Sequence, residues 1–161
     1  QARLAGHATA AEFEVWQWLT IRAGVPIVTA ATQDALVVQV ANWDVLGGVD
    51  FKKGCYTGQE IIARTHYLGR IKERTFLFHA EVSDVAPGDR IFSAVFEGQP
   101  CGTVVNAARA PGGGFDLLAV LQIGAQERGD ARLRAADGPP LTSLPLPYVI
   151  PAATAPRGRP S

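Results

Sequence analysis

The feature that most constrains the fold is a change in the apolar pattern near Arg74. Beyond this point, short extended runs alternate with turn sequences, and the first run, residues 75–82, places Phe76, Phe78 and Ala80 at every second position. Short strands separated by frequent turns are typical of a small barrel or sandwich. The further predicted strands are residues 91–96, 102–107, 115–122 and 131–135.

The part before Arg74 shows helical spacing instead. Phe13, Trp16 and Leu19 recur at intervals of three within residues 8–23, which predicts one helix with these side chains on a single face. An aromatic residue on such a face is usually a packing residue, and we first interpret Trp16 in that way. Gly24 and Pro26 end the helix, and residues 35–40 read as a short strand.

Composition excludes several classes of protein. Apolar residues make up 47% of the 161 positions, too many for a disordered chain. Fifteen basic residues balance fifteen acidic ones, so the total charge gives no sign of a strongly basic nucleic-acid binder. Two cysteines do not form a disulfide framework, and no apolar run is long enough to span a membrane. We therefore expect a soluble, cytoplasmic protein, and the lack of methionine suggests part of a longer gene product.

The segment of residues 50–64 carries the most chemical information. Thr57 and Glu60 precede two isoleucines in the pattern of a capping box, with Thr57 as the expected N-cap. Cys55 would then lie just before a helix N-terminus, close to Lys52 and Lys53, and this environment favours a thiolate. The alternative is that Cys55 is a small buried apolar residue, since no histidine lies at a diagnostic spacing and no zinc pattern is present. We interpret Cys101 as structural.

The run Lys53-Gly54-Cys55-Tyr56-Thr57-Gly58-Gln59-Glu60 resembles the signature of the YgfZ family, whose members are related to the T-protein aminomethyltransferase of the glycine cleavage system. Three flanking segments also resemble the family: residues 23–26, the run from Asn42 to residue 52, and residues 64–69. Residues 144–148 are similar to its closing segment. The similarity covers nearly the whole chain up to about residue 150.

The resemblance implies an α+β fold. Residues 1–74 would form the C-terminal portion of a T-protein-like folate-binding domain, and residues 75–149 a small antiparallel β-barrel. Residues 150–161 are rich in proline, alanine and arginine, and we expect a disordered tail there. The family has a further N-terminal part that supplies the rest of the folate pocket, so this chain alone is expected to bind tetrahydrofolate poorly.

The resemblance also implies a function. Family members bind tetrahydrofolate and support the assembly or repair of iron–sulfur clusters in client enzymes, among them a tRNA-methylthiolating enzyme. Cys55 is then the candidate functional thiol, and no metal ligands are predicted. The expected cofactor-binding residues are Trp16, Asn42, Lys53, Tyr56, Gln59, Glu60 and Arg64. Several relatives have an acidic residue at the position of Arg22. A carboxylate there can accept hydrogen bonds from a pterin, whereas an arginine cannot, so the expected pterin contact differs in this chain.

Two other functions remain open from the sequence. One is an aminomethyltransferase that transfers a one-carbon unit to tetrahydrofolate, although the signature cysteine favours the accessory role. The other is weak RNA contact through the stretch from Lys52 to Arg74, which contains six basic and two acidic residues. A solvated helix end and linker explain the same charges, and base-stacking aromatic residues are sparse there.

Overall fold

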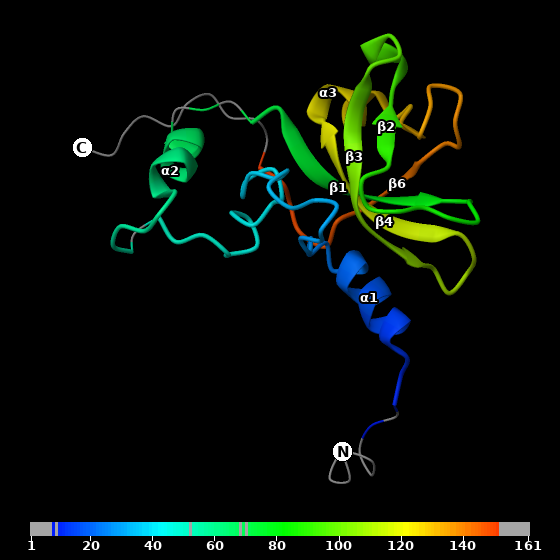
Figure 1. The fold of residues 1–161 in the computed structure, drawn as a ribbon, viewed down its shortest axis with the longest axis horizontal. Coiled ribbons are helices and arrows are strands. Elements are labelled where there is room, and N and C mark those ends of the chain that lie inside the picture. The colour runs from blue at the N-terminus through cyan, green and yellow to red at the C-terminus, as the bar shows by residue number, and fades with distance from the viewer. Residues whose placement is uncertain (1–7, 9, 52, 68, 70, 152–161) are drawn as a thin grey trace.

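The computed structural model describes residues 8, 10–51, 53–67, 69 and 71–151. Its centre is a six-stranded antiparallel sheet with the order β5-β2-β3-β4-β1-β6, which curls into a half-barrel (Figure 1). The strands are β1 (Glu73–Ala80), β2 (Arg90–Phe92), β3 (Pro100–Arg109), β4 (Phe115–Gln122), β5 (Arg132–Leu133) and β6 (Thr142–Leu144). The helices are α1 (Phe13–Arg22), α2 (Gln59–Tyr67) and α3 (Ile123–Arg128), with a 3₁₀ turn η1 (Ala94–Phe96).

The two longest pairings fix the centre of the sheet. Strand β1 pairs with β4 over its full length, from Glu73 opposite Gln122 to Ala80 opposite Phe115. Strand β3 pairs with the other edge of β4, and a register shift between Val104 and Asn106 bends it. Such an irregularity increases the local twist and helps a sheet to curl.

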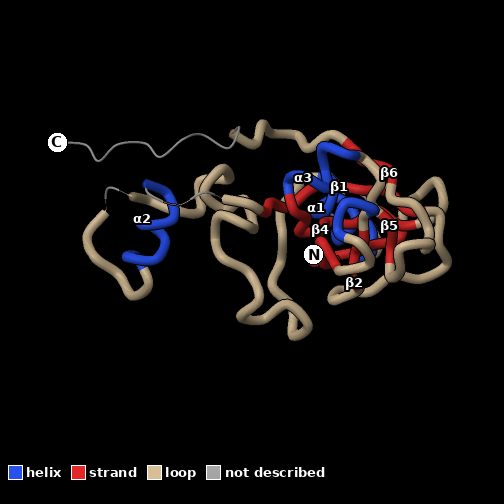
Figure 2. Tube along the Cα trace, turned by 90° about the horizontal axis from the view of Figure 1, so that it is seen from above, coloured by secondary structure: helices blue, strands red, loops and turns tan. Residues whose placement is uncertain are grey.

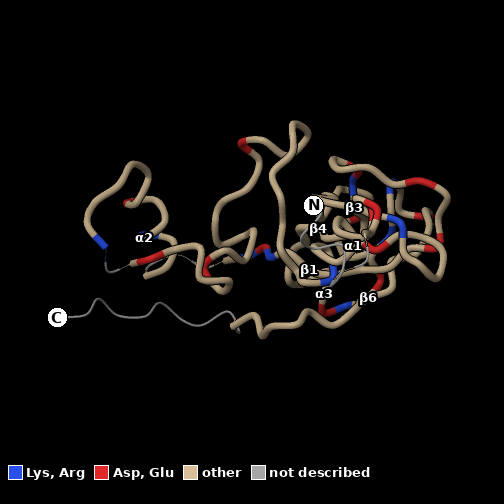
Figure 3. The backbone as a smooth tube through the Cα atoms, turned by 90° about the horizontal axis from the view of Figure 1, so that it is seen from below, with Lys and Arg blue, Asp and Glu red and all other residues tan. Residues whose placement is uncertain are grey.

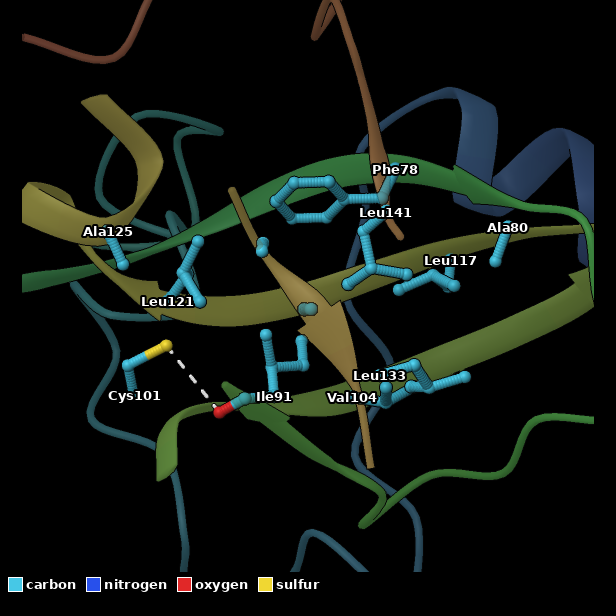
Figure 4. Packing of buried hydrophobic residues seen from close by; sticks show 12 residues of the cluster. Phe78, Ala80, Ile91, Cys101, Val104, Leu117, Leu121, Ala125, Leu133 and Leu141 are labelled. Carbon is cyan, nitrogen blue, oxygen red and sulfur yellow. Dashed lines mark hydrogen bonds between the residues drawn. The ribbon is translucent and has the colours of Figure 1, made fainter. Parts of the chain in front are cut away.

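The main core lies inside this curl (Figure 4). Phe78, Ile91, Leu117 and Leu133 are at most 1% exposed there. Because side chains alternate between the two faces of a strand, this face takes every second residue of β1 and β4. The opposite face carries a smaller cluster in which Leu77, Ala108 and Leu118 pack against Ile21 of α1.

Helix α1 therefore lies on the outer face of the sheet, whereas α2 stands away from it in both Figure 1 and Figure 2. All described residues of α2 are at least partly exposed. Figure 3 shows acidic and basic residues interspersed around the sheet and along the chain near α2. In the described part of the chain, each helix is too short or too polar to cross a membrane.

Several predictions from the sequence are confirmed, and others are wrong. The strand at residues 115–122 is confirmed. The strand predicted at residues 91–96 is confirmed only up to Phe92, where β2 ends, and η1 follows. The strand predicted at residues 35–40 is wrong, because residues 35–37 have no regular structure and residues 38–40 form turns. Helix α1 is shorter than expected, and Phe13, Trp16 and Leu19 are 64%, 53% and 52% exposed, so the predicted packing face is the exposed one. The expected tail lies almost wholly in residues 152–161, outside the described residues.

Candidate functional site

The candidate thiol, Cys55, lies exposed in the loop that leads to α2. In the same loop, the ammonium group of Lys53 lies 4.5 Å from the centre of the Tyr56 ring, within range of a cation–π contact. An exposed thiol at this position is accessible to another macromolecule. The reading of Cys55 as a buried apolar residue is therefore wrong.

The start of α2 differs from the predicted capping box. The helix begins at Gln59, so Thr57 is not the residue directly before it. Instead, the backbone N–H of Tyr56 donates to Oε1 of Gln59 at 3.1 Å, and Gly58 has a φ of 85°. Glycine adopts this left-handed conformation at little cost, whereas a side chain would strain it. Gln59 thus orders the loop that carries Cys55.

Helix α2 itself presents charged residues to solvent. Glu60 and Arg64 are exposed and lie one helical turn apart. Near its C-terminal end, the ring of His66 stacks on Phe51 at 4.0 Å between ring centres. Of the basic stretch predicted from the sequence, Lys52 and Arg70 lie outside the described residues, and Arg74 is buried.

One side chain ties α2 to the rest of the chain. The Nε2 amide of Gln39 donates to the carbonyl of Ile62 at 2.7 Å, and Gln39 is fully buried. Its Oε1 is the one buried side-chain polar atom without a hydrogen-bond partner in the described part of the structure. Burial of Oε1 without a partner costs free energy. The contacts that keep Gln39 in place are therefore those of its amide nitrogen and its backbone carbonyl.

Asn42 has a different environment from the other predicted contacts. It is fully buried with a φ of 60°, and its Nδ2 donates to the carbonyl of Thr75 at 2.7 Å and to the hydroxyl of Tyr148 at 3.3 Å. Next to it, Arg74 forms a buried ion pair with Asp44 at 2.7 Å. These contacts join the segment before α2 to β1 and to the C-terminal segment.

Trp16 lies on the exposed side of α1. Its ring stacks on Phe13 with 5.6 Å between ring centres and borders a pocket of about 320 Å³. The pocket lies between α1, the segment after it and β3, with Val25, Ile27 and Asn106 among its lining residues. A half-exposed indole beside an apolar pocket is suited to stacking against a flat ring.

Trp18 points to the sheet and takes part in a polar cluster. Its Nε1 donates to Oδ2 of Asp116 at 2.8 Å, and Arg22 lies 3.5 Å from the same oxygen. Nδ1 of His79 donates to Oδ1 of Asp116 at 2.8 Å, while its Nε2 lies 3.1 Å from Glu81. The hydrogen bond to Asp116 is the largest cause that shifts the pKa of His79, and it raises it. Burial opposes this effect, and the hydrogen bond to Glu81 adds a smaller increase, so the pKa is raised overall. The sequence carries no local signal for this cluster, because its members come from separate elements.

The predicted site residues thus lie in three separate places. Trp16 lies on α1 beside the sheet, whereas Lys53, Tyr56, Gln59, Glu60 and Arg64 lie on or before α2, and Figures 1 and 2 both place the two helices apart. Asn42 lies buried between β1 and the C-terminal segment. The assignment of these residues to cofactor binding stays a prediction.

Cys101 is a packing residue by its environment. It is 2% exposed, its Sγ donates to the carbonyl of Ile91 at 3.5 Å, and burial raises the pKa of its thiol (Figure 4). Within the described residues, no group of three or more histidine, cysteine or acidic side chains is placed to hold a metal ion.

Comparison with known proteins places the chain among its relatives. No protein-family model matches it. It is 34% identical over 149 residues to the tRNA-modifying protein YgfZ of Edwardsiella ictaluri, covering 91% of this chain and 45% of the relative. It is 36% identical over 138 residues to the protein of the same name from Pectobacterium atrosepticum, covering 83% and 41%. The chain therefore spans about half the length of the curated relatives that it matches, and it belongs to the YgfZ family.

Proposed function

We propose that this protein is a tetrahydrofolate-binding accessory factor that supports iron–sulfur cluster assembly or repair and thereby tRNA modification. The observation that carries the proposal is the 34–36% identity to two proteins named tRNA-modifying protein YgfZ. The exposed Cys55 in the signature loop is consistent with it. In this proposal the cluster belongs to the client enzyme and is not a resident group of this chain.

The arrangement of the signature loop supports a role for Cys55 in contact with a client. Gln59 holds the loop through the backbone of Tyr56, and Lys53 lies against the Tyr56 ring, so the thiol is presented on an ordered segment. Helix α2 stands away from the sheet, which leaves room for a partner to approach. The proposed partners are iron–sulfur enzymes such as a tRNA-methylthiolating enzyme, in the cytoplasm.

The pocket beside Trp16 supports the proposal of folate binding. Its lining is mainly apolar, and Trp16 offers an aromatic face at its edge, which fits a flat pterin or benzoyl ring. Gln17 and Thr20 supply polar atoms from the same helix. In this proposal, residues 1–74 are part of a T-protein-like domain, and tetrahydrofolate is bound through Trp16 while the signature residues contact the ligand or the client.

Equilibrium titration of the intact gene product with tetrahydrofolate tests the cofactor. Saturable binding is the expected result, and no binding at millimolar ligand would contradict this part of the proposal. An assay of methylene-tetrahydrofolate formation from aminomethylated lipoyl protein separates the accessory role from an aminomethyltransferase. Titration with tRNA at low salt tests RNA contact through residues 52–74, which would weaken steeply as salt is added.

A further inference from the structure

The carboxylate of Asp116 connects three separate parts of the fold. Asp116 lies on β4, and its side chain is only 5% exposed. It accepts hydrogen bonds from Trp18 of α1 and His79 of β1, each at 2.8 Å, and Arg22 of α1 lies 3.5 Å away. A buried carboxylate needs such donors to offset its loss of hydration. Two of these three partners, Trp18 and Arg22, come from the same helix.

Helix α1 depends on such contacts for its position. It has ten residues, and an isolated helix of that length is marginal in water. Its apolar contact with the sheet is small, with Ile21 as its one buried residue. Beyond the helix, Tyr148 donates to the carbonyl of Gly24 at 2.7 Å, and the Asn106 amide pairs with the backbone of Ile27. Asp116 of β4 provides the polar contacts that hold the helix itself, through Trp18 and Arg22.

The position of α1 also sets the shape of the pocket beside Trp16. Trp16, Gln17 and Thr20 of α1 form one wall, whereas Asn106 and Ala107 of β3 belong to the sheet. Movement of the helix over the sheet would therefore change the width of the pocket, although Asp116 is not one of the residues that line it.

We propose that Asp116 is a positioning residue that holds α1 against β3 and β4 and thereby keeps the pocket beside Trp16 in a form that can take a planar ligand. The ligand in this inference is tetrahydrofolate, so that part rests on the proposed function; the positioning of α1 does not. The charge of His79 makes the cluster sensitive to pH. The two charged groups that face His79 are Asp116 on β4 and Glu81 just after β1. Arg22 pairs with the same Asp116, and the neutral Thr142 lies opposite His79 on β6.

Hydrogen–deuterium exchange measures the positioning of α1 directly. Trp18→Phe removes the donor to Asp116 and keeps most of the ring packing, so we expect the α1 amides to exchange about tenfold faster, as for loss of one hydrogen bond to a charged group. The amides of β3 and β4 serve as the internal reference. Trp43→Phe is the matched control, because Trp43 is also partly buried but lies in the turn segment before α2. Asp116→Asn should increase α1 exchange at least as much. We also expect the protection of the α1 amides, corrected for the intrinsic pH dependence of exchange, to fall between pH 6 and pH 8, and His79→Gln should abolish this fall.

The outcomes separate the inference from the proposed function. Unchanged α1 exchange in both Trp18→Phe and Asp116→Asn would overturn the positioning role, as would an equal increase across the whole sheet. Titration with tetrahydrofolate is then made on the intact gene product, where we expect about tenfold weaker binding by Trp18→Phe and none of this loss by Trp43→Phe. If the unsubstituted protein does not bind, the proposed function fails while the exchange result stands. If it binds and Trp18→Phe binds equally well, the link from Asp116 to the pocket is wrong.

Discussion

Oδ2 of Asp116 accepts a hydrogen bond from Nε1 of Trp18 at 2.8 Å, although 98 positions separate the two residues in the sequence. This contact fixes which side of α1 faces the sheet. It turns Trp18 inward and leaves Trp16 exposed beside the pocket, so the two tryptophans have different roles.

Asp116→Asn is expected to lower the free energy of unfolding. The asparagine side chain would keep one acceptor oxygen, but its NH₂ group would face the N–H donor of either Trp18 or His79. Two buried donors would then lie against each other without an acceptor. We expect a loss of about 2–3 kcal/mol in urea denaturation. Glu81→Gln is the control, because Glu81 is 83% exposed and its removal should change stability by less than about 1 kcal/mol. Equal stability of Asp116→Asn and the unsubstituted protein would contradict this reading of the cluster.

The stability of the protein is expected to depend on His79 near neutral pH. The pKa of His79 is raised in the folded protein, first by its hydrogen bond to Asp116. The stabilisation is therefore complete below the unfolded-state pKa of about 6.5 and is lost as the pH rises through the higher folded-state pKa. Thermal unfolding between pH 5.5 and pH 8.5 should show this loss in the unsubstituted protein and a flatter profile in His79→Gln. Parallel profiles would exclude His79 as the titrating group.

The sheet could largely be predicted from the sequence because its longer strands are short apolar runs separated by turn residues, a pattern that is visible locally. Residues 115–122 follow the glycine-rich turn at residues 111–114 and form β4, as predicted. Residues 35–40 have the composition of a strand, but tertiary contacts override this preference. Gln39 is buried within a turn, and its side-chain amide donates a hydrogen bond to the carbonyl of Ile62. Short apolar runs are ambiguous for this reason.

The candidate site was less predictable than the sheet, for one local reason and one long-range reason. The signature loop around Cys55 could be recognised, but the Gln59 contact to Tyr56 replaces the predicted capping box. Periodicity identified α1 but not the face that packs, because Trp18 is held by Asp116 from a distant strand. Apolar spacing gives no information on such a partner.

Substitution of Asn42 separates a structural role from a ligand contact. Asn42→Ala removes three hydrogen bonds, to Thr75, Tyr148 and Arg74, and leaves a side chain at a φ of 60°, so we expect a loss of about 2–4 kcal/mol in unfolding free energy. Asn42→Gly tolerates the backbone conformation and should lose about 1 kcal/mol less. If both variants keep full stability and only tetrahydrofolate binding falls, Asn42 is a ligand contact after all.

Trp16→Ala and Trp18→Ala are expected to affect different properties. Trp16 is 53% exposed, so its removal should change the unfolding free energy by less than about 1 kcal/mol while weakening tetrahydrofolate binding at least about tenfold. Trp18→Ala should cost about 3 kcal/mol or more, because it removes packing and a hydrogen bond together. Chemical denaturation and ligand titration of the same preparations give both values. Full affinity in Trp16→Ala would remove Trp16 from the ligand site.

The most direct test of the proposed function is the content of methylthiolated nucleosides in tRNA from cells whose only copy of the gene carries Cys55→Ser. Cys101→Ala is the matched control, since Cys101 is buried and Cys55 is exposed. We predict that Cys55→Ser lowers the methylthiolated fraction at equal protein level, while Cys101→Ala leaves it close to normal. Normal methylthiolation in both Cys55→Ser and Cys55→Ala would contradict the proposed role of the signature thiol in tRNA modification.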